Sequence, residues 1–109
     1  MDNSAVSPGV ALTTDLSQEE SIPYFLWDEP MTLRDLRERL ARSDEERVRL
    51  LGKILREARE PDIWLFTTAE EVDRRWSQLE RHLGRRREFW RFLLGRWRAG
   101  FAELNALSD

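Results

Sequence analysis

Apolar side chains recur at intervals of three and four residues along most of the chain after residue 32, a spacing that predicts amphipathic helices. Four helical stretches follow from this spacing and from polar residues that commonly start or stop helices: 33–41, 44 to about 59, about 69–83 and about 85–107. Gly84 is a natural left-handed stop between the last two. No segment alternates with period two. We therefore expect an all-α fold, a small bundle of about four short helices.

A dense apolar segment precedes the first of these helices. Residues 22–27 read Ile-Pro-Tyr-Phe-Leu-Trp, and prolines stand at positions 23 and 30. Proline disfavours helix for the residue before it. We therefore expect residues 22–31, called the arm below, to be extended or to form a single turn against the helical domain.

The first 21 residues differ from everything that follows. They are polar and acidic, and they contain no aromatic residue and no periodic apolar pattern. Such composition is typical of disordered segments. We predict a disordered acidic tail at 1–21 and one helical domain at 22–109 that includes the arm.

Charge is divided unevenly along the chain. The net charge is −3, but residues 1–33 hold six acids and no base, which leaves 18 bases and 15 acids, or +3, for the remainder. Seventeen of the bases are arginine. Arginine suits carboxylate and phosphate recognition, although genome composition can produce the same bias. Both explanations stay open.

The sequence gives little support to secretion, membrane insertion or cysteine chemistry. Cysteine is absent, the start of the chain has no basic segment followed by an apolar run, and the apolar runs span only a few residues, as at 92–94. A membrane-spanning helix needs about 20 apolar residues, and secretory signals need a continuous apolar region. We expect a cytoplasmic protein that does not enter membranes.

Residue patterns for catalysis are also missing. The single histidine, His82, falls in the last turn of a predicted helix and lacks the spacing of a metal site. No glycine-rich phosphate loop occurs, and the acidic clusters at 44–46 and 70–71 open predicted helices, where acids favour the helix dipole. We expect no enzyme activity, no cofactor and no metal.

Two features could serve binding. In the arm, the candidate partner-binding residues are Tyr24, Phe25, Trp27, Asp28 and Glu29. Aromatic residues such as tryptophan and tyrosine dominate interface hot spots, so the arm could anchor in a partner's pocket. The alternative is that the aromatic residues only close one end of the core.

The second feature is a basic stretch at 81–98 with seven arginines and one acid. Arginines with interleaved aromatics would suit a phosphate backbone and unstacked bases, but arginine stems also cover ordinary helices. A solvated or self-paired face, an acidic protein partner and nucleic acid all remain open. The candidate residues are Arg85, Arg86, Arg87, Arg91, Arg96 and Arg98.

Four segments resemble a family of short bacterial proteins: Ile-Pro-Tyr-Phe-Leu-Trp-Asp at 22–28, Leu-Leu-Gly-Lys-Ile-Leu-Arg-Glu-Ala at 50–58, Asp-Ile-Trp-Leu-Phe-Thr-Thr at 62–68, and Arg-Glu-Phe-Trp-Arg-Phe-Leu-Leu-Gly-Arg-Trp at 87–97. That family resembles companions encoded beside nucleotidyltransferases of the AbiEii/AbiGii toxin type. The resemblance implies an antitoxin-like or accessory role, in which the chain binds and restrains the transferase. It assigns no functional residues.

These observations lead to a ranked set of hypotheses. The first is a non-catalytic protein-binding module that contacts its partner, a nucleotidyltransferase, through the arm. The alternative is a nucleic-acid-binding accessory protein that uses the arginines of the last helix. A third is a homo-oligomer built on a face containing Trp90 and Trp97.

Overall fold

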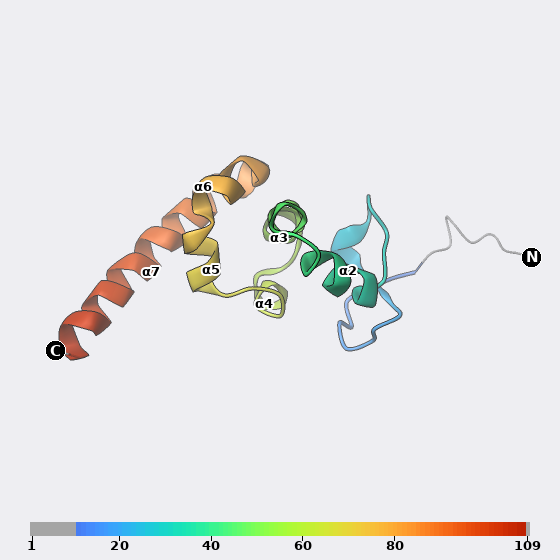
Figure 1. Ribbon diagram of the computed structural model, residues 1–109, viewed down its shortest axis with the longest axis horizontal. Helices are drawn as coiled ribbons and strands as arrows, with labels where there is room; N and C mark the ends of the chain where they lie inside the picture. Colours follow the sequence, from blue (N-terminus) through green and yellow to red (C-terminus); the bar gives the residue numbers. More distant parts are fainter. Residues whose placement is uncertain (1–10, 109) are drawn as a thin grey trace, which may run out of the picture.

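The computed structural model describes residues 11–108, with side chains described as far as residue 100. Two short strands and a 3-10 turn precede the helices. In the view of Figure 1, α2 lies on one side of α3, and α5, α6 and α7 lie on the other. The elements are β2 (Leu12–Thr13), β3 (Ile22–Pro23), η1 (Tyr24–Leu26), α2 (Leu33–Leu40), α3 (Asp44–Glu57), α4 (Glu60–Ile63), α5 (Ala69–Arg74), α6 (Trp76–Leu79), η2 (Glu80–His82), η3 (Gly84–Arg86) and α7 (Arg87–Ser108).

The predicted helical class is confirmed, and three helices begin at the caps that the sequence indicates. The side chain of Thr32 accepts the Asp35 N–H at 3.1 Å, and Ser43 and Thr68 accept the N–H three residues further on in the same way. Each cap satisfies one of the unpaired donors in a first helical turn. The only departure from an all-α fold among the described residues is the two-residue parallel pairing of β2 with β3.

The number of helices differs from the prediction. The described residues form six α-helices instead of about four, because the expected helix over 69–83 is divided into α5 and α6, followed by η2, and because Glu60–Ile63 forms the short helix α4. Arg75 leaves the helical conformation (φ −98°, ψ 10°). Leu79 and Leu83, which follow the break, are both fully buried. Local periodicity alone does not indicate such a break.

Residues 11–21, the described part of the predicted tail, are joined to the start of α2 by two backbone hydrogen bonds. The carbonyl of Ser21 accepts the Leu33 N–H at 2.9 Å, and the carbonyl of Glu19 accepts the Arg34 N–H at 2.9 Å. These bonds satisfy donors at the start of α2 that have no partner within the helix. Residues 1–10, the rest of the predicted tail, lie outside the described residues.

The core is built around α3, which is enclosed on most of its circumference. Leu50, Leu51, Ile54 and Leu55 are all 0% exposed. At Gly52 the neighbouring η2 approaches so closely that an added Cβ would lie 2.5 Å from the Cβ of His82. Glycine is thus required at this crossing because no side chain fits between the two segments.

The first turns of α7 complete this core, and the rest of the helix projects away from it (Figure 1). Trp90 is 0% exposed and its indole Nε1 donates to the carbonyl of Leu55 at 2.9 Å. Leu94, one turn later, is also buried. Along the described residues, no helix has the length and apolar character needed to cross a membrane.

Candidate protein-binding surfaces

Phe25 lies in the core and not on a binding surface. It is 1% exposed, and its ring makes edge-to-face contacts with Tyr24 (centroids 5.3 Å apart) and Phe66 (5.8 Å). The adjacent Leu26 is 0% exposed. The 3-10 turn η1 therefore inserts two side chains of the arm into the interior.

Tyr24 fixes the arm to the start of α4. Its hydroxyl donates to Asp62 Oδ2 at 2.6 Å and accepts the Arg59 N–H at 2.7 Å, and the Arg59 guanidinium lies over the ring. Partial burial, followed by the bond to Asp62, raises the pKa of the Tyr24 hydroxyl. Every polar atom of this side chain thus has a partner within the chain.

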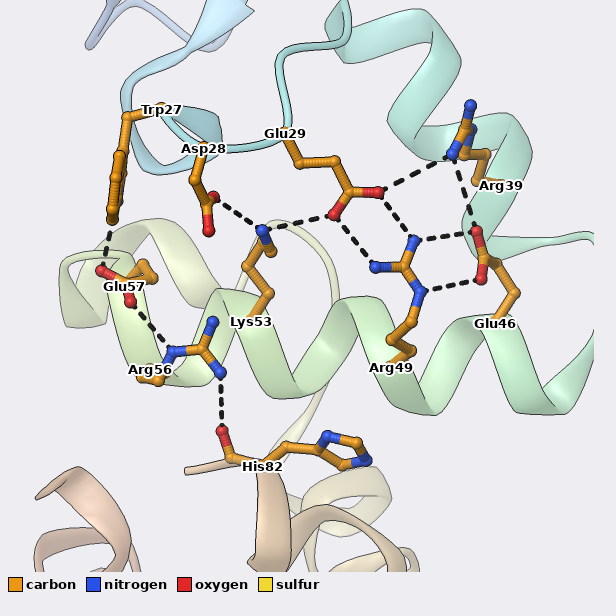
Figure 2. Close-up of polar contacts among 10 residues, drawn as sticks. All are labelled: Trp27, Asp28, Glu29, Arg39, Glu46, Arg49, Lys53, Arg56, Glu57 and His82. Atoms are coloured by element: carbon orange, nitrogen blue, oxygen red, sulfur yellow. Dashed lines mark hydrogen bonds and ion pairs between the residues drawn. The ribbon is translucent and has the colours of Figure 1, made fainter. Parts of the chain in front are cut away.

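The two carboxylates of the arm pair with bases on α3 (Figure 2). Lys53 Nζ donates to Asp28 Oδ1 at 2.7 Å and lies 3.2 Å from Glu29 Oε1. Arg49 holds Glu29 by two parallel bonds of 2.9 Å each. The Lys53 bond lowers the pKa of Asp28, and the Arg49 bonds lower the pKa of Glu29 to about 2.

This network extends along α3 to the end of α2. Arg49 also bonds to Glu46 at 3.0 Å, and Arg39 approaches both Glu46 and Glu29 at 3.8 Å (Figure 2). Lys53 itself is only 8% exposed. A buried ammonium requires compensating charge, so the arm's carboxylates have a structural role in neutralising Lys53 and Arg49.

Trp27 is the exception within the arm. Its side chain is 60% exposed, and the single hydrogen bond of its indole, to Glu57 Oε1, is long at 3.5 Å (Figure 2). It directly follows Leu26, which is fully buried. The turn η1 therefore presents one large aromatic side chain to solvent from a fixed backbone, with the carboxylates of Asp28 and Glu57 beside it.

The basic stretch is divided in a similar way. Arg86 Nη1 donates to the carbonyls of Ala58 (2.8 Å) and Leu55 (3.1 Å). This guanidinium therefore supplies hydrogen-bond donors to carbonyl groups at the C-terminal end of α3 that lack a partner within the helix. It also lies over the rings of Phe89 and Trp90. Arg86 is therefore a structural residue.

Three further arginines of α7 form ion pairs within the chain. Arg87 and Arg91 both contact Glu80 Oε1, at 3.3 and 2.7 Å, and Arg98 Nε donates to Asp73 Oδ1 at 2.6 Å. All three are exposed, and such pairs contribute little to stability. They nevertheless reduce the positive charge that α7 presents.

Arg85 and Arg96 are left without an ion pair among the described residues. The Arg96 guanidinium lies 5.9 Å from the centroid of Phe92, which is 62% exposed, and Phe89 one turn earlier is 41% exposed. We call Phe89, Phe92 and Arg96, with Arg85 one turn before them, the outer face of α7. Neither phenylalanine was among the candidate binding residues that the sequence indicated.

The face expected for a homo-oligomer is occupied within the chain. Trp90 is buried, and Trp97 is half-buried against Trp64, with the ring centroids 5.5 Å apart. The sequence analysis also missed the buried carboxylate of Glu71, which Arg47 holds by bonds of 2.6 and 2.7 Å. These bonds lower the pKa of Glu71 to about 2.

His82 lies where α3 and η2 meet, beside a hollow of ≈ 620 Å³ between α3 and α6–η2. Its carbonyl accepts a bond of 2.9 Å from Arg56 Nη1 (Figure 2). Burial, followed by the nearby charges of Arg81 and Arg56, lowers the pKa of the imidazole.

Among residues 11–100, no group of three or more histidine, aspartate or glutamate side chains is placed to hold a metal ion. No family model, curated protein or solved structure matches this chain.

Proposed function

We propose that this protein is a non-catalytic, cytoplasmic binding module that docks on a partner protein through Trp27. The observation that carries the proposal is the contrast within the arm: four of its five candidate residues have partners inside the chain, and Trp27 is 60% exposed. A large aromatic side chain exposed on a fixed turn is typical of an interface anchor.

The surroundings of Trp27 favour high affinity at low entropic cost. Phe25 and Leu26 hold the preceding backbone in the core, so binding would order few additional torsions. Asp28 is 39% exposed even while paired with Lys53, and Glu57 lies on the other side. Both carboxylates are ion-paired within the chain, so Trp27 is an exposed aromatic centre with a polar rim.

We further propose that the partner is a nucleotidyltransferase, which this chain restrains in the manner of an antitoxin. Support comes from the resemblance of residues 22–28, 50–58, 62–68 and 87–97 to companions of the AbiEii/AbiGii toxin type. A transferase that handles nucleotides has cationic groups near its substrate groove. Trp27 is the arm's exposed aromatic side chain that would enter such a groove.

The alternative, a nucleic-acid-binding protein, has weaker support. Of the six candidate arginines, Arg86 caps α3 and three others are ion-paired. Phosphate binding would have to replace these pairs. A steep loss of RNA or DNA affinity with rising salt would favour the alternative over a protein interface.

The test uses the intact protein and a nucleotidyltransferase encoded beside it. We expect Trp27→Ala to weaken the complex by about thirtyfold, as hot-spot truncations do, and to release the transferase from inhibition. Leu65→Ala is the matched control, since Leu65 is an apolar residue of similar exposure (52%) on the turn after α4. Circular dichroism verifies that both variants fold.

Two results would contradict the proposal at different points. If the wild-type protein does not bind the transferase, the assigned partner is wrong. If it binds but Trp27→Ala and Leu65→Ala weaken the complex equally, the assigned surface is wrong.

A further inference from the structure

The outer face of α7 is a second exposed surface, which the proposed function does not use. α7 packs on α5 and η3 through its inner side, and the helix otherwise runs clear of the domain (Figure 1). Phe89 is 41% and Phe92 62% exposed on the opposite side. Two exposed phenylalanines one turn apart form an apolar surface that costs free energy in water.

A positively charged residue lies at each end of this apolar surface. Phe89, Phe92 and Arg96 recur at intervals of three and four residues, so they share one side of the helix. Arg85 lies one turn earlier, in η3. Neither arginine has an ion pair among the described residues, in contrast to Arg87, Arg91 and Arg98. At a rise of about 1.5 Å per residue, the two uncompensated cations stand about 16 Å apart along the axis.

The shape beside Phe92 admits the backbone of another helix. A shallow hollow of ≈ 590 Å³ follows this side of α7. Added Cβ atoms at Gly95 and Gly100 would meet nothing within 4 Å. Small residues in open space allow a partner helix to approach closely. The hollow is lined by Arg91, Phe92, Gly95, Arg96, Ala99 and Gly100.

We propose that the outer face of α7 binds an acidic amphipathic helix of a partner protein. Its apolar stripe would cover Phe89 and Phe92, and its carboxylates would pair with Arg85 and Arg96. Helix-in-groove recognition uses this combination of apolar anchors at helical spacing and flanking charge. The proposal extends beyond the function assigned to Trp27 and does not depend on it.

A protein helix fits this surface better than a nucleic acid does. The guanidinium of Arg96 already lies over the Phe92 ring, and that of Arg86 over the Phe89 ring, so each ring has one face occupied. Base stacking needs an accessible ring face, whereas an apolar side chain can pack against the exposed edge. On the outer face itself, Arg85 and Arg96 are the two arginines without an ion pair among the described residues, which is little positive charge for a phosphate backbone.

The experiment titrates the full-length protein with two synthetic helical peptides. They share one leucine stripe and differ only in carrying glutamate or lysine at the flanking positions. A 15-nucleotide oligouridylate is the third probe. We expect the acidic peptide to bind about tenfold more tightly than the basic one, and Phe92→Ala to reduce its affinity about tenfold. Arg96→Glu should reduce it by about threefold or more.

Matched controls separate the surface from general effects. Arg42→Glu makes the same change of charge at an exposed position between α2 and α3 and should leave the affinity nearly unchanged. Trp27→Ala should also leave it unchanged, so failure here and failure of the proposed function can be told apart.

Three results would overturn the inference. The first is equal binding of both peptides, and the second is acidic-peptide binding that Phe92→Ala does not alter. The third is a different occupant: oligouridylate binding more tightly than the acidic peptide, or self-association in sedimentation that Phe92→Ala abolishes.

Discussion

Phe25 in the arm and Phe92 on α7 are the same residue type, and both have charged residues nearby, yet one is 1% and the other 62% exposed. The carboxylates that follow Phe25 pair with Lys53 and Arg49 of α3. Arg96, one turn after Phe92, has no ion pair among the described residues and only covers part of the ring. Phenylalanine and charged side chains thus close the fold in the arm. On α7 the same kinds of side chains remain exposed and available for binding.

The largest expected effect comes from truncating each phenylalanine in turn. Phe25→Ala should lower the free energy of unfolding by about 3–5 kcal/mol, because it leaves a cavity in the core. Phe92→Ala should change it by less than about 0.5 kcal/mol, as is usual for surface substitutions. Urea unfolding measures both. Similar decreases in the free energy of unfolding for the two variants would show that Phe25 and Phe92 do not differ in their contribution to the core.

A second comparison uses two helical glycines. Gly52→Ala places a Cβ 2.5 Å from that of His82 and should destabilise the protein by about 1–3 kcal/mol, the usual cost of overpacking. Gly95→Ala meets no atom within 4 Å and should stabilise α7 by up to about 1 kcal/mol through helix propensity. Thermal unfolding should therefore shift in opposite directions. A stabilising Gly52→Ala would contradict the close approach of η2 to α3.

The sequence predicts those features that depend on a few neighbouring residues. Thr32, Ser43 and Thr68 mark the starts of their helices correctly because a cap bonds to an N–H three residues away. The arm's prolines likewise indicate a non-helical segment, as found at β3. Local chemistry was sufficient in these cases.

Features that depend on distant residues were not predictable. The helix break at Arg75 has no signal in the neighbouring residues, and the bonds of Glu19 and Ser21 join residues that are 15 and 12 positions away at the start of α2. The arm's acids look like a binding motif in the sequence because their partners, Arg49 and Lys53, lie at least 20 residues away. Which charges are compensated is decided by the fold.

The structural role of the arm's carboxylates also predicts how stability varies with pH. Glu29 has a folded-state pKa of about 2, below its ordinary value of 4.5. Ionised Glu29 therefore contributes its full stabilisation above pH 4.5 and loses it as the pH falls toward 2. Glu29→Gln should remove this contribution, at a cost of about 1–2 kcal/mol at neutral pH, and should make the loss of stability in acid less steep.

The most direct test of the account is an NMR titration of the Glu29 side-chain carboxyl carbon in the folded protein. The account predicts a midpoint well below 4.5, near 2, which Arg49→Gln moves upward because Arg49 is the main cause of the shift. That result would establish that the Glu29 carboxylate is compensated inside the fold, in contrast to Arg96 on the outer face of α7. A midpoint near 4.5 that Arg49→Gln does not change would mean that the carboxylate is solvated and available to a partner, and the contrast between the two regions would be wrong.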